Sequence, residues 1–315
     1  MAVDPQILQF YQRLAEQFGA LPPPEDAPAQ RARFEAIAAV SERPDPEGVD
    51  VSDLSLPLVG RTLDAIVFRP KGVITPRLLV WFHGGGWVVG APRTTHRMLA
   101  ALVAQDTGCA VVSVDYRLAP EHAFPTPADD ARDALAYLAE QRAYLDFDPE
   151  FLAVGGDSAG GHLAVQAAQG MRPGLVNAQF LLYPVTTPAF GSESYNAFAQ
   201  GPGLTRDEMR WYWEKYIGAE ALAKPLAEHD ARIFLMARAP AYTPPDTVVI
   251  VAAHDVLRDD GLQYADYLVQ HGAQVITIEA SGMTHAFARI QFEAERAREW
   301  MRRAAHAFVG IISEE

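Results

Sequence analysis

The sequence predicts an α/β protein, with a mostly parallel central sheet flanked by helices and a helical cap over one end. Short apolar runs, several nearly continuous in Val, Ile, Leu or Phe, alternate along the chain with longer amphipathic stretches. Runs that are apolar on both faces are typical of central parallel strands, and strand–helix alternation is typical of a sheet covered on both faces. Two helical segments that add no strand predict the cap.

The strands and helices of the sheet are expected in alternation. Seven apolar runs are expected to form strands, at residues 63–69, 78–83, 110–114, 151–154, 179–183, 247–252 and 274–278. Five amphipathic stretches are expected to form helices, at residues 93–105, 128–141, 159–169, 261–271 and 289–309. The crossovers between parallel strands are expected to be right-handed.

Two segments interrupt this alternation. Residues 4–46 are expected to form two helices joined by a turn at Leu21-Pro22-Pro23-Pro24, and residues 186–230 begin rich in Pro, Gly and Ser before an aromatic stretch, 209–213. Because neither segment adds a strand, we expect them to pack together as a lid. The expected division is a helical segment at 1–46 that is part of the cap, the first part of the core at 47–185, a cap insertion at 186–230 and the second part of the core at 231–315.

Composition limits the classes of partner. The 315 residues, 49% of them apolar, are enough for one large α/β domain with a lid. The 26 Lys and Arg residues against 40 Asp and Glu give a net charge of −14, which repels nucleic-acid phosphates and anionic membranes. A single cysteine, Cys109, excludes an internal disulfide, and its apolar neighbours predict buried packing. With neither a signal-peptide pattern nor an apolar stretch of about 20 residues, the chain is expected to be soluble and cytoplasmic.

The strongest local motif is G-x-S-x-G at residues 156–160, between an apolar strand and a helix rich in small residues. This spacing places a serine on a tight strand-to-helix turn, where glycines avoid collisions that side chains would cause. Ser158 is therefore the expected nucleophile. An ordinary glycine-rich turn between strand and helix is the alternative. Two nucleotide-binding turns fit less well, because Asp157 stands where a dinucleotide-binding turn needs its second glycine and a phosphate loop would need Lys before Ser or Thr.

A second motif, His83-Gly84-Gly85-Gly86-Trp87, ends the strand expected at 78–83. Consecutive glycines allow backbone N–H groups to point into a cavity, as a developing oxyanion requires. Alone, the motif is also compatible with a flexible turn. Beside the serine turn it predicts an oxyanion loop, which would act together with the amide of Ala159.

The base and the acid are chosen by their order along the chain. A serine hydroxyl needs a base, and the base needs an acid that fixes its tautomer. His285 follows the last expected strand, in a loop at 281–287, and Asp255 follows the strand at 247–252. Asp259 and Asp260, the alternatives for the acid, are more typical of helix caps. The histidines that compete with His285 precede the acid or lie in expected helices, namely His83, His122, His162, His271 and His306.

Three motifs matter in combination: those at 83–87 and 156–161, and the block Asp115-Tyr116-Arg117-Leu118-Ala119-Pro120-Glu121-His122. Together they resemble the hormone-sensitive-lipase-like family, the bacterial family IV carboxylesterases of the α/β-hydrolase superfamily. The resemblance covers nearly the whole chain. It implies an α/β-hydrolase fold, an oxyanion hole formed by the amides of Gly85, Gly86 and Ala159, and a preference for short to medium acyl chains. The chain departs from the family at Val256 and Ala286, where Pro and Gly are common. The block at 115–122 contains no nucleophile and is expected to support the edge of the sheet.

The resemblance and the motifs together predict a serine carboxylesterase that needs no metal and no organic cofactor. Its expected partner is a small-molecule ester, and an exposed sheet edge is compatible with a homodimer. Two other functions remain open, namely a non-catalytic small-molecule receptor on the same scaffold and an amidase or peptidase that uses the same serine. Four residues are candidates for the lining of the pocket: Trp87, Tyr183, Met209 and Trp211.

Overall fold

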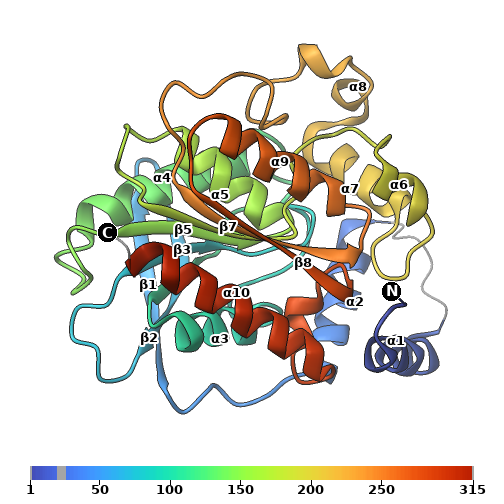
Figure 1. Ribbon diagram of the computed structural model, residues 1–315, viewed down its shortest axis with the longest axis horizontal. Coiled ribbons are helices and arrows are strands. Elements are labelled where there is room, and N and C mark those ends of the chain that lie inside the picture. The colour runs from blue at the N-terminus through green and yellow to red at the C-terminus, as the bar shows by residue number, and fades with distance from the viewer. Residues whose placement is uncertain (1, 20–25, 314–315) are drawn as a thin grey trace.

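The computed structural model describes residues 2–19 and 26–313, and its centre is an eight-stranded sheet (Figure 1). The strands lie in the order β1-β2-β4-β3-β5-β6-β7-β8. The two pairings that involve β2 are antiparallel and the other five are parallel, so the prediction of a mostly parallel sheet is confirmed. The strands are β1 Val49–Leu58, β2 Arg61–Pro70, β3 Leu78–Phe82, β4 Ala110–Val114, β5 Leu152–Asp157, β6 Ala178–Leu182, β7 Asp246–His254 and β8 Val275–Thr284.

The first strand of the sheet was not predicted from the sequence. β1 pairs with β2 along its whole length, from Val49 opposite Pro70 to Leu58 opposite Arg61. Only Val49 and Leu56 of β1 are buried, because β1 lies at the edge of the sheet. Its sequence therefore lacks the continuous apolar character that identified the other seven strands.

Helices cover both faces of the sheet. Buried side chains of α4 Thr126–Gln141, α5 Ala159–Gln169 and α9 Arg258–Gln270 form one core cluster. Those of α3 Arg97–Thr107 and α10 Glu295–Ser313 form the second. The prediction of a helix at 289–309 was wrong at its start, because a short 3₁₀ turn, η2 Phe287–Arg289, precedes α10. Among the helices of the described residues, none combines the length and the apolar character that a membrane crossing requires.

Where the structure describes them, the two segments that interrupt the alternation contain helices and no strand. They contain α1 Pro5–Phe18 and α2 Ala27–Val40, then α6 Glu193–Ala197, α7 Arg206–Ile217 and α8 Ala219–Leu222. The turn predicted at 21–24 lies outside the described residues. Thr205 and Glu208 form a reciprocal capping box that starts α7. Figure 1 shows α1, α2, α6 and α7 gathered at one end of the sheet.

Candidate active site

Ser158 lies on the tight turn between β5 and α5, as the motif predicts. Its backbone has φ 55° and ψ −119°, a conformation that is strained for any residue with a side chain. The Ser158 amide donates a hydrogen bond to the carbonyl of Leu182 on β6, 2.9 Å away. A Cβ at Gly160 would collide with the carbonyl of Phe82 at the end of β3. The turn therefore requires glycine at this position and holds the Ser158 hydroxyl at the edge of the sheet.

Ser158, His285 and Asp255 form a continuous chain of hydrogen bonds. The His285 Nε2 lies 3.0 Å from the Ser158 Oγ, and the His285 Nδ1 lies 2.7 Å from an Asp255 carboxylate oxygen. The second Asp255 oxygen accepts a hydrogen bond from the Leu257 amide at 3.0 Å. The Nδ1–H of His285 donates a hydrogen bond to Asp255, so Nε2 carries a free lone pair and can accept the serine proton. Three residues distant in the sequence are thus brought together in the order that nucleophilic catalysis needs.

The strands place these three residues side by side. β5, β7 and β8 lie in one parallel part of the sheet, so their carboxyl ends meet at one edge. The loop predicted at 281–287 is shorter than expected, because β8 continues to Thr284 and His285 follows it directly. The ring of Tyr183 packs edge-on against the imidazole of His285, with 4.9 Å between the ring centres. This contact limits rotation of the imidazole.

The alternative acids are engaged elsewhere. Asp259 accepts a hydrogen bond from the amide of Ser194 at 2.8 Å, and Asp260 accepts one from the amide of Thr186 at 2.9 Å. Both lie in the first turn of α9, as expected, but their carboxyl groups bind the segment that follows β6. Burial raises the pKa of Asp260 to about 8. Neither carboxyl group is in the chain of hydrogen bonds that reaches Ser158.

The competing histidines also lie in other places. His83 and His162 are fully buried, and burial lowers the pKa of His83 to about 3 and that of His162 to about 4. The His162 ring contacts the carbonyl of Ile233. His306 is exposed on α10 and His271 caps the end of α9. Buried neutral imidazoles of this kind support packing.

The glycine loop at 83–87 adopts backbone conformations that favour glycine. Gly85 has φ 114° and Gly86 has φ 57°. In the described part of the chain, the amides of Gly85, Gly86 and Ala159 donate no hydrogen bond to another protein group. All three residues line the cavity that contains Ser158. Free amides beside a serine hydroxyl are the feature that an oxyanion hole needs.

The block at 115–122 supports this loop from behind. The Tyr116 hydroxyl donates a hydrogen bond to the carbonyl of His83 at 2.7 Å, and the two rings stack with 4.4 Å between their centres. The Ala119 amide donates to the carbonyl of Trp87 at 2.9 Å. The block therefore holds both ends of the glycine loop.

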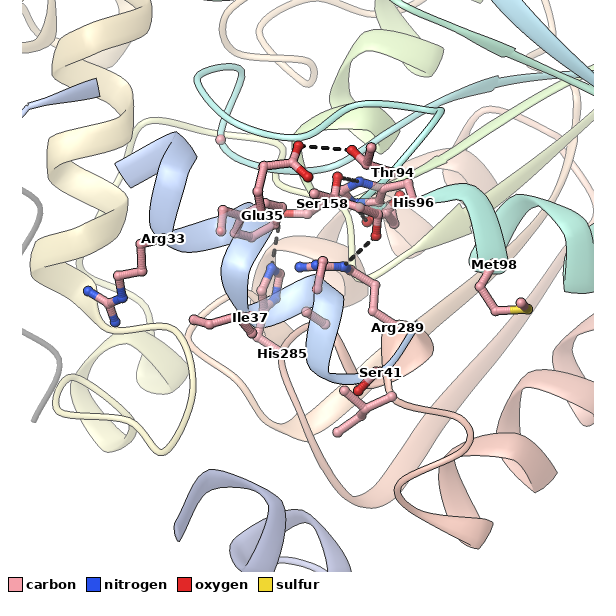
Figure 2. Close-up of a pocket in the computed structure, with 18 of the residues that line it drawn as sticks. Arg33, Glu35, Ile37, Ser41, Thr94, His96, Met98, Ser158, His285 and Arg289 are labelled. Carbon is pink, nitrogen blue, oxygen red and sulfur yellow. Dashed lines mark hydrogen bonds and ion pairs between the residues drawn. The ribbon is translucent and has the colours of Figure 1, made fainter. Parts of the chain in front are cut away.

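A cavity of about 1050 Å³ opens in front of Ser158 and His285 (Figure 2). Trp87 and Met209 line it, as expected, whereas Tyr183 and Trp211 do not. The segments at the end of the sheet supply much of its wall, namely Phe10, Tyr11 and Leu14 of α1, Phe34 and Ile37 of α2, and Met209 and Tyr212 of α7. Within the described residues, no group of three or more His, Cys, Asp or Glu side chains is arranged to hold a metal ion.

Several residues of the site were not identified from the sequence. Asp157 is buried next to Ser158, accepts a hydrogen bond from the Gly84 amide and lies 3.3 Å from a ring nitrogen of His96. Arg289 extends into the cavity from η2. Only its position inside the serine motif could have indicated from the sequence that Asp157 belongs to the site. For His96 and Arg289 the sequence offers none, because their place in the site depends on the tertiary fold.

The chain is similar to known hydrolases in sequence. A family model described as an alpha/beta hydrolase fold matches residues 79–289. The chain is 34% identical over 282 residues to an ethyl acetate hydrolase of Pseudomonas putida, covering 87% of each chain. It is 35% identical over 281 residues to the carboxylic ester hydrolase LipN of Mycobacterium tuberculosis, covering 84% of this chain and 70% of LipN.

Solved structures of esterases are also similar. The structure of a hyperthermophilic esterase from Pyrobaculum calidifontis matches with a TM-score of 0.89 at 32% identity, over 99% of both chains. That of a thermostable esterase from Pseudomonas putida matches with a TM-score of 0.87 at 30% identity, over 96% of both chains. The similarity therefore includes the helical segments at the end of the sheet as well as the sheet itself.

Proposed function

The chain belongs to the hormone-sensitive-lipase-like family of α/β hydrolases and is a carboxylic ester hydrolase, and we propose that it works as a serine esterase with an acyl-enzyme intermediate. The observation that carries this mechanism is the chain of hydrogen bonds from Ser158 through His285 to Asp255.

The proposed reaction has two halves. The Ser158 Oγ attacks the ester carbonyl while the His285 Nε2 takes its proton, and Asp255 stabilises the imidazolium that forms. The protonated His285 then donates its proton to the departing alcohol. In the second half, water attacks the acyl-enzyme with His285 as base, and Ser158 leaves with the returned proton.

The negative charge of each tetrahedral intermediate falls on the former carbonyl oxygen. We assign its stabilisation to the amides of Gly85, Gly86 and Ala159, because all three are free of protein acceptors within the described residues. One such donor typically contributes about 10²–10³ in turnover.

The substrate is proposed to be an ester with a short to medium acyl chain. The wall of the cavity is largely apolar, and one similar protein is named an ethyl acetate hydrolase. We further propose that residues 1–46 and 186–230 act together as a cap over the core segments 47–185 and 231–315. A hydrogen bond of 3.1 Å between Gln30 of α2 and the hydroxyl of Tyr212 on α7 joins the two cap segments and supports this division.

Hydrolysis of p-nitrophenyl butyrate tests the mechanism. The wild-type protein is expected to release nitrophenol, and Ser158→Ala is expected to lose about 10⁶ in kcat, as in comparable triads. Ser52→Ala, at an exposed position on β1, is the matched control and should retain full activity. A matched butyryl anilide separates an esterase from an amidase. A wild-type protein that releases no nitrophenol, or a Ser158→Ala variant that remains active, would refute the proposal.

A further inference from the structure

The guanidinium of Arg289 lies inside the candidate active site. Arg289 ends the short turn η2, four residues after His285, and its side chain points into the cavity beside Ser158 and His285 (Figure 2). The Arg289 Nε donates a hydrogen bond to the carbonyl of Thr95 at 3.3 Å. The guanidinium lies over the ring of Phe34 on α2, 4.1 Å from the ring centre. Both contacts fix the direction of the side chain.

Arg289 differs from other arginines around the cavity in its partners. Three other arginines that line the cavity are ion-paired: Arg43 with Glu293 at 3.3 Å, Arg93 with Asp53 at 2.7 Å, and Arg97 with Asp45 at 2.5 Å. Within residues 2–19 and 26–313, Arg289 forms no ion pair, and its two terminal nitrogens donate no hydrogen bond. Four N–H donors of a charged group are therefore left for a bound molecule.

The nearest negative charges do not occupy these donors. Asp157 interacts with Arg289 electrostatically, but its carboxylate is directed to the Gly84 amide and to His96. Glu35 is exposed and accepts a hydrogen bond from the Thr94 hydroxyl at 2.8 Å. Burial lowers the pKa of Arg289, but a guanidinium remains charged at neutral pH. A cation with a fixed orientation thus faces a cavity whose walls are mainly apolar.

We propose that Arg289 binds a carboxylate carried by the substrate, so that the preferred substrates are esters with a free carboxylate group. The inference rests on the proposed esterase function and narrows its substrate class. A planar guanidinium binds a carboxylate through two parallel hydrogen bonds, and partial exclusion of water strengthens the attraction. The carboxylate belongs either to the acid part, as in a monoester of a dicarboxylic acid, or to the alcohol part, as in an acylated hydroxy acid.

Two pairs of nearly isosteric esters test the proposal. Monoethyl succinate is compared with ethyl succinamate for the acid part, and O-acetyl lactate with O-acetyl lactamide for the alcohol part. In at least one pair, the wild-type protein is expected to favour the carboxylate in kcat/KM by roughly 10- to 100-fold, as one charge-assisted interaction allows. Arg289→Met is expected to abolish that ratio, and Arg289→Lys to retain part of it.

The matched control is Arg93→Met, which removes an arginine at the same cavity whose charge is already paired with Asp53. Arg93→Met should leave the ratio of kcat/KM between carboxylate and carboxamide esters unchanged. A wild-type protein without preference in either pair, or an Arg289→Met variant that keeps the preference, would overturn the proposal. If the wild-type protein hydrolyses the ester bond of the carboxamide analogues as fast as that of the carboxylates, the carboxylate proposal is refuted while the esterase function remains intact.

Binding to an inactive protein separates recognition from turnover. In a Ser158→Ala background, calorimetric titration with monoethyl succinate and O-acetyl lactate is expected to show binding of at least one ester that weakens roughly 10-fold or more when Arg289→Met is added. Equal affinity with and without Arg289 would contradict the proposal even if no ester were hydrolysed. A solely structural role for Arg289, in support of the Asp157 charge, would lower stability without changing the selectivity between carboxylate and amide.

Discussion

The carboxylate of Asp157 accepts a hydrogen bond from the amide of Gly84, 3.1 Å away, and so joins the serine turn to the glycine loop. Asp157 precedes Ser158 in the chain and is fully buried. Burial favours the neutral acid, but the neighbouring His96 and Arg289 more than offset it and lower the pKa of Asp157 below its usual value. A buried charge therefore sets the relative position of the nucleophile and its proposed oxyanion donors.

Replacement of this charge should impair turnover more than binding. Asp157→Asn retains the size of the side chain but weakens the bond to Gly84, so we expect kcat for p-nitrophenyl butyrate to fall about 10-fold, less than the loss of an oxyanion donor. KM should change about twofold or less. Steady-state kinetics, with the unfolding temperature as a check on folding, measure both. A variant with unchanged kcat would show that the two loops keep their positions without the charge.

Gly160 should be irreplaceable for a structural reason. The collision of a Cβ with the Phe82 carbonyl would force α5 away from β3, so Gly160→Ala is expected to lower the free energy of unfolding by about 3 kcal/mol or more. Gly310→Ala is the matched control, because Gly310 lies in α10 with open space around it. It should raise stability by about 0.5–1 kcal/mol. Urea denaturation measures the free energy of unfolding of both variants. Equal changes in the two variants would refute the close-packing argument.

Much of the sheet could be predicted because its central strands are buried on both faces. β4 and α5 match their predicted ranges, whereas β1 was missed because its outward residues are polar and Pro57 interrupts the pattern. The start of α10 was also predicted too early in the chain. Residues 289–294 are compatible with a helix by composition, but Ala286 adopts φ 61° and directs the chain into a tight turn.

The three residues of the candidate triad could be found because each follows a strand in a fixed order. Motifs identify such residues, since their chemistry limits the residue types at each position. The contacts of Arg289 with Thr95 and Phe34 could not be found in this way. They join segments that are distant in sequence, and only the packing of α2 against the end of the sheet brings them together. The cytoplasmic location and the homodimer stay predictions.

Asp260 should make the stability of the protein depend on pH. Burial raises the pKa of Asp260 from 3.8 to about 8. Between these values the folded state holds a proton that the unfolded state has lost, so stability falls as pH rises from about 4 to about 8. The slope from this group approaches about 1.4 kcal/mol per pH unit. Asp260→Asn should remove this contribution, and urea midpoints of both proteins at pH 5 to 8 should converge at low pH. If the urea midpoints of the two proteins changed in parallel with pH, the raised pKa of Asp260 would be contradicted.

Cys109 should be unreactive in the folded protein. The thiol is buried, and burial raises its pKa to about 11, so the thiolate that reacts with disulfide reagents is scarce at neutral pH. Dithionitrobenzoate is expected to titrate no thiol in the native protein and one per chain in guanidinium chloride. Rapid reaction of the native protein would show that the thiol is accessible.

The central claim is that Ser158 is the nucleophile activated by His285 and Asp255. Paraoxon phosphorylates activated serines, so labelling followed by peptide mass mapping tests the claim most directly. We predict one diethylphosphoryl group per chain, on Ser158, and a labelling rate that falls by about 10³-fold or more in His285→Ala. An adduct on another residue, or equal labelling without His285, would contradict the assignment.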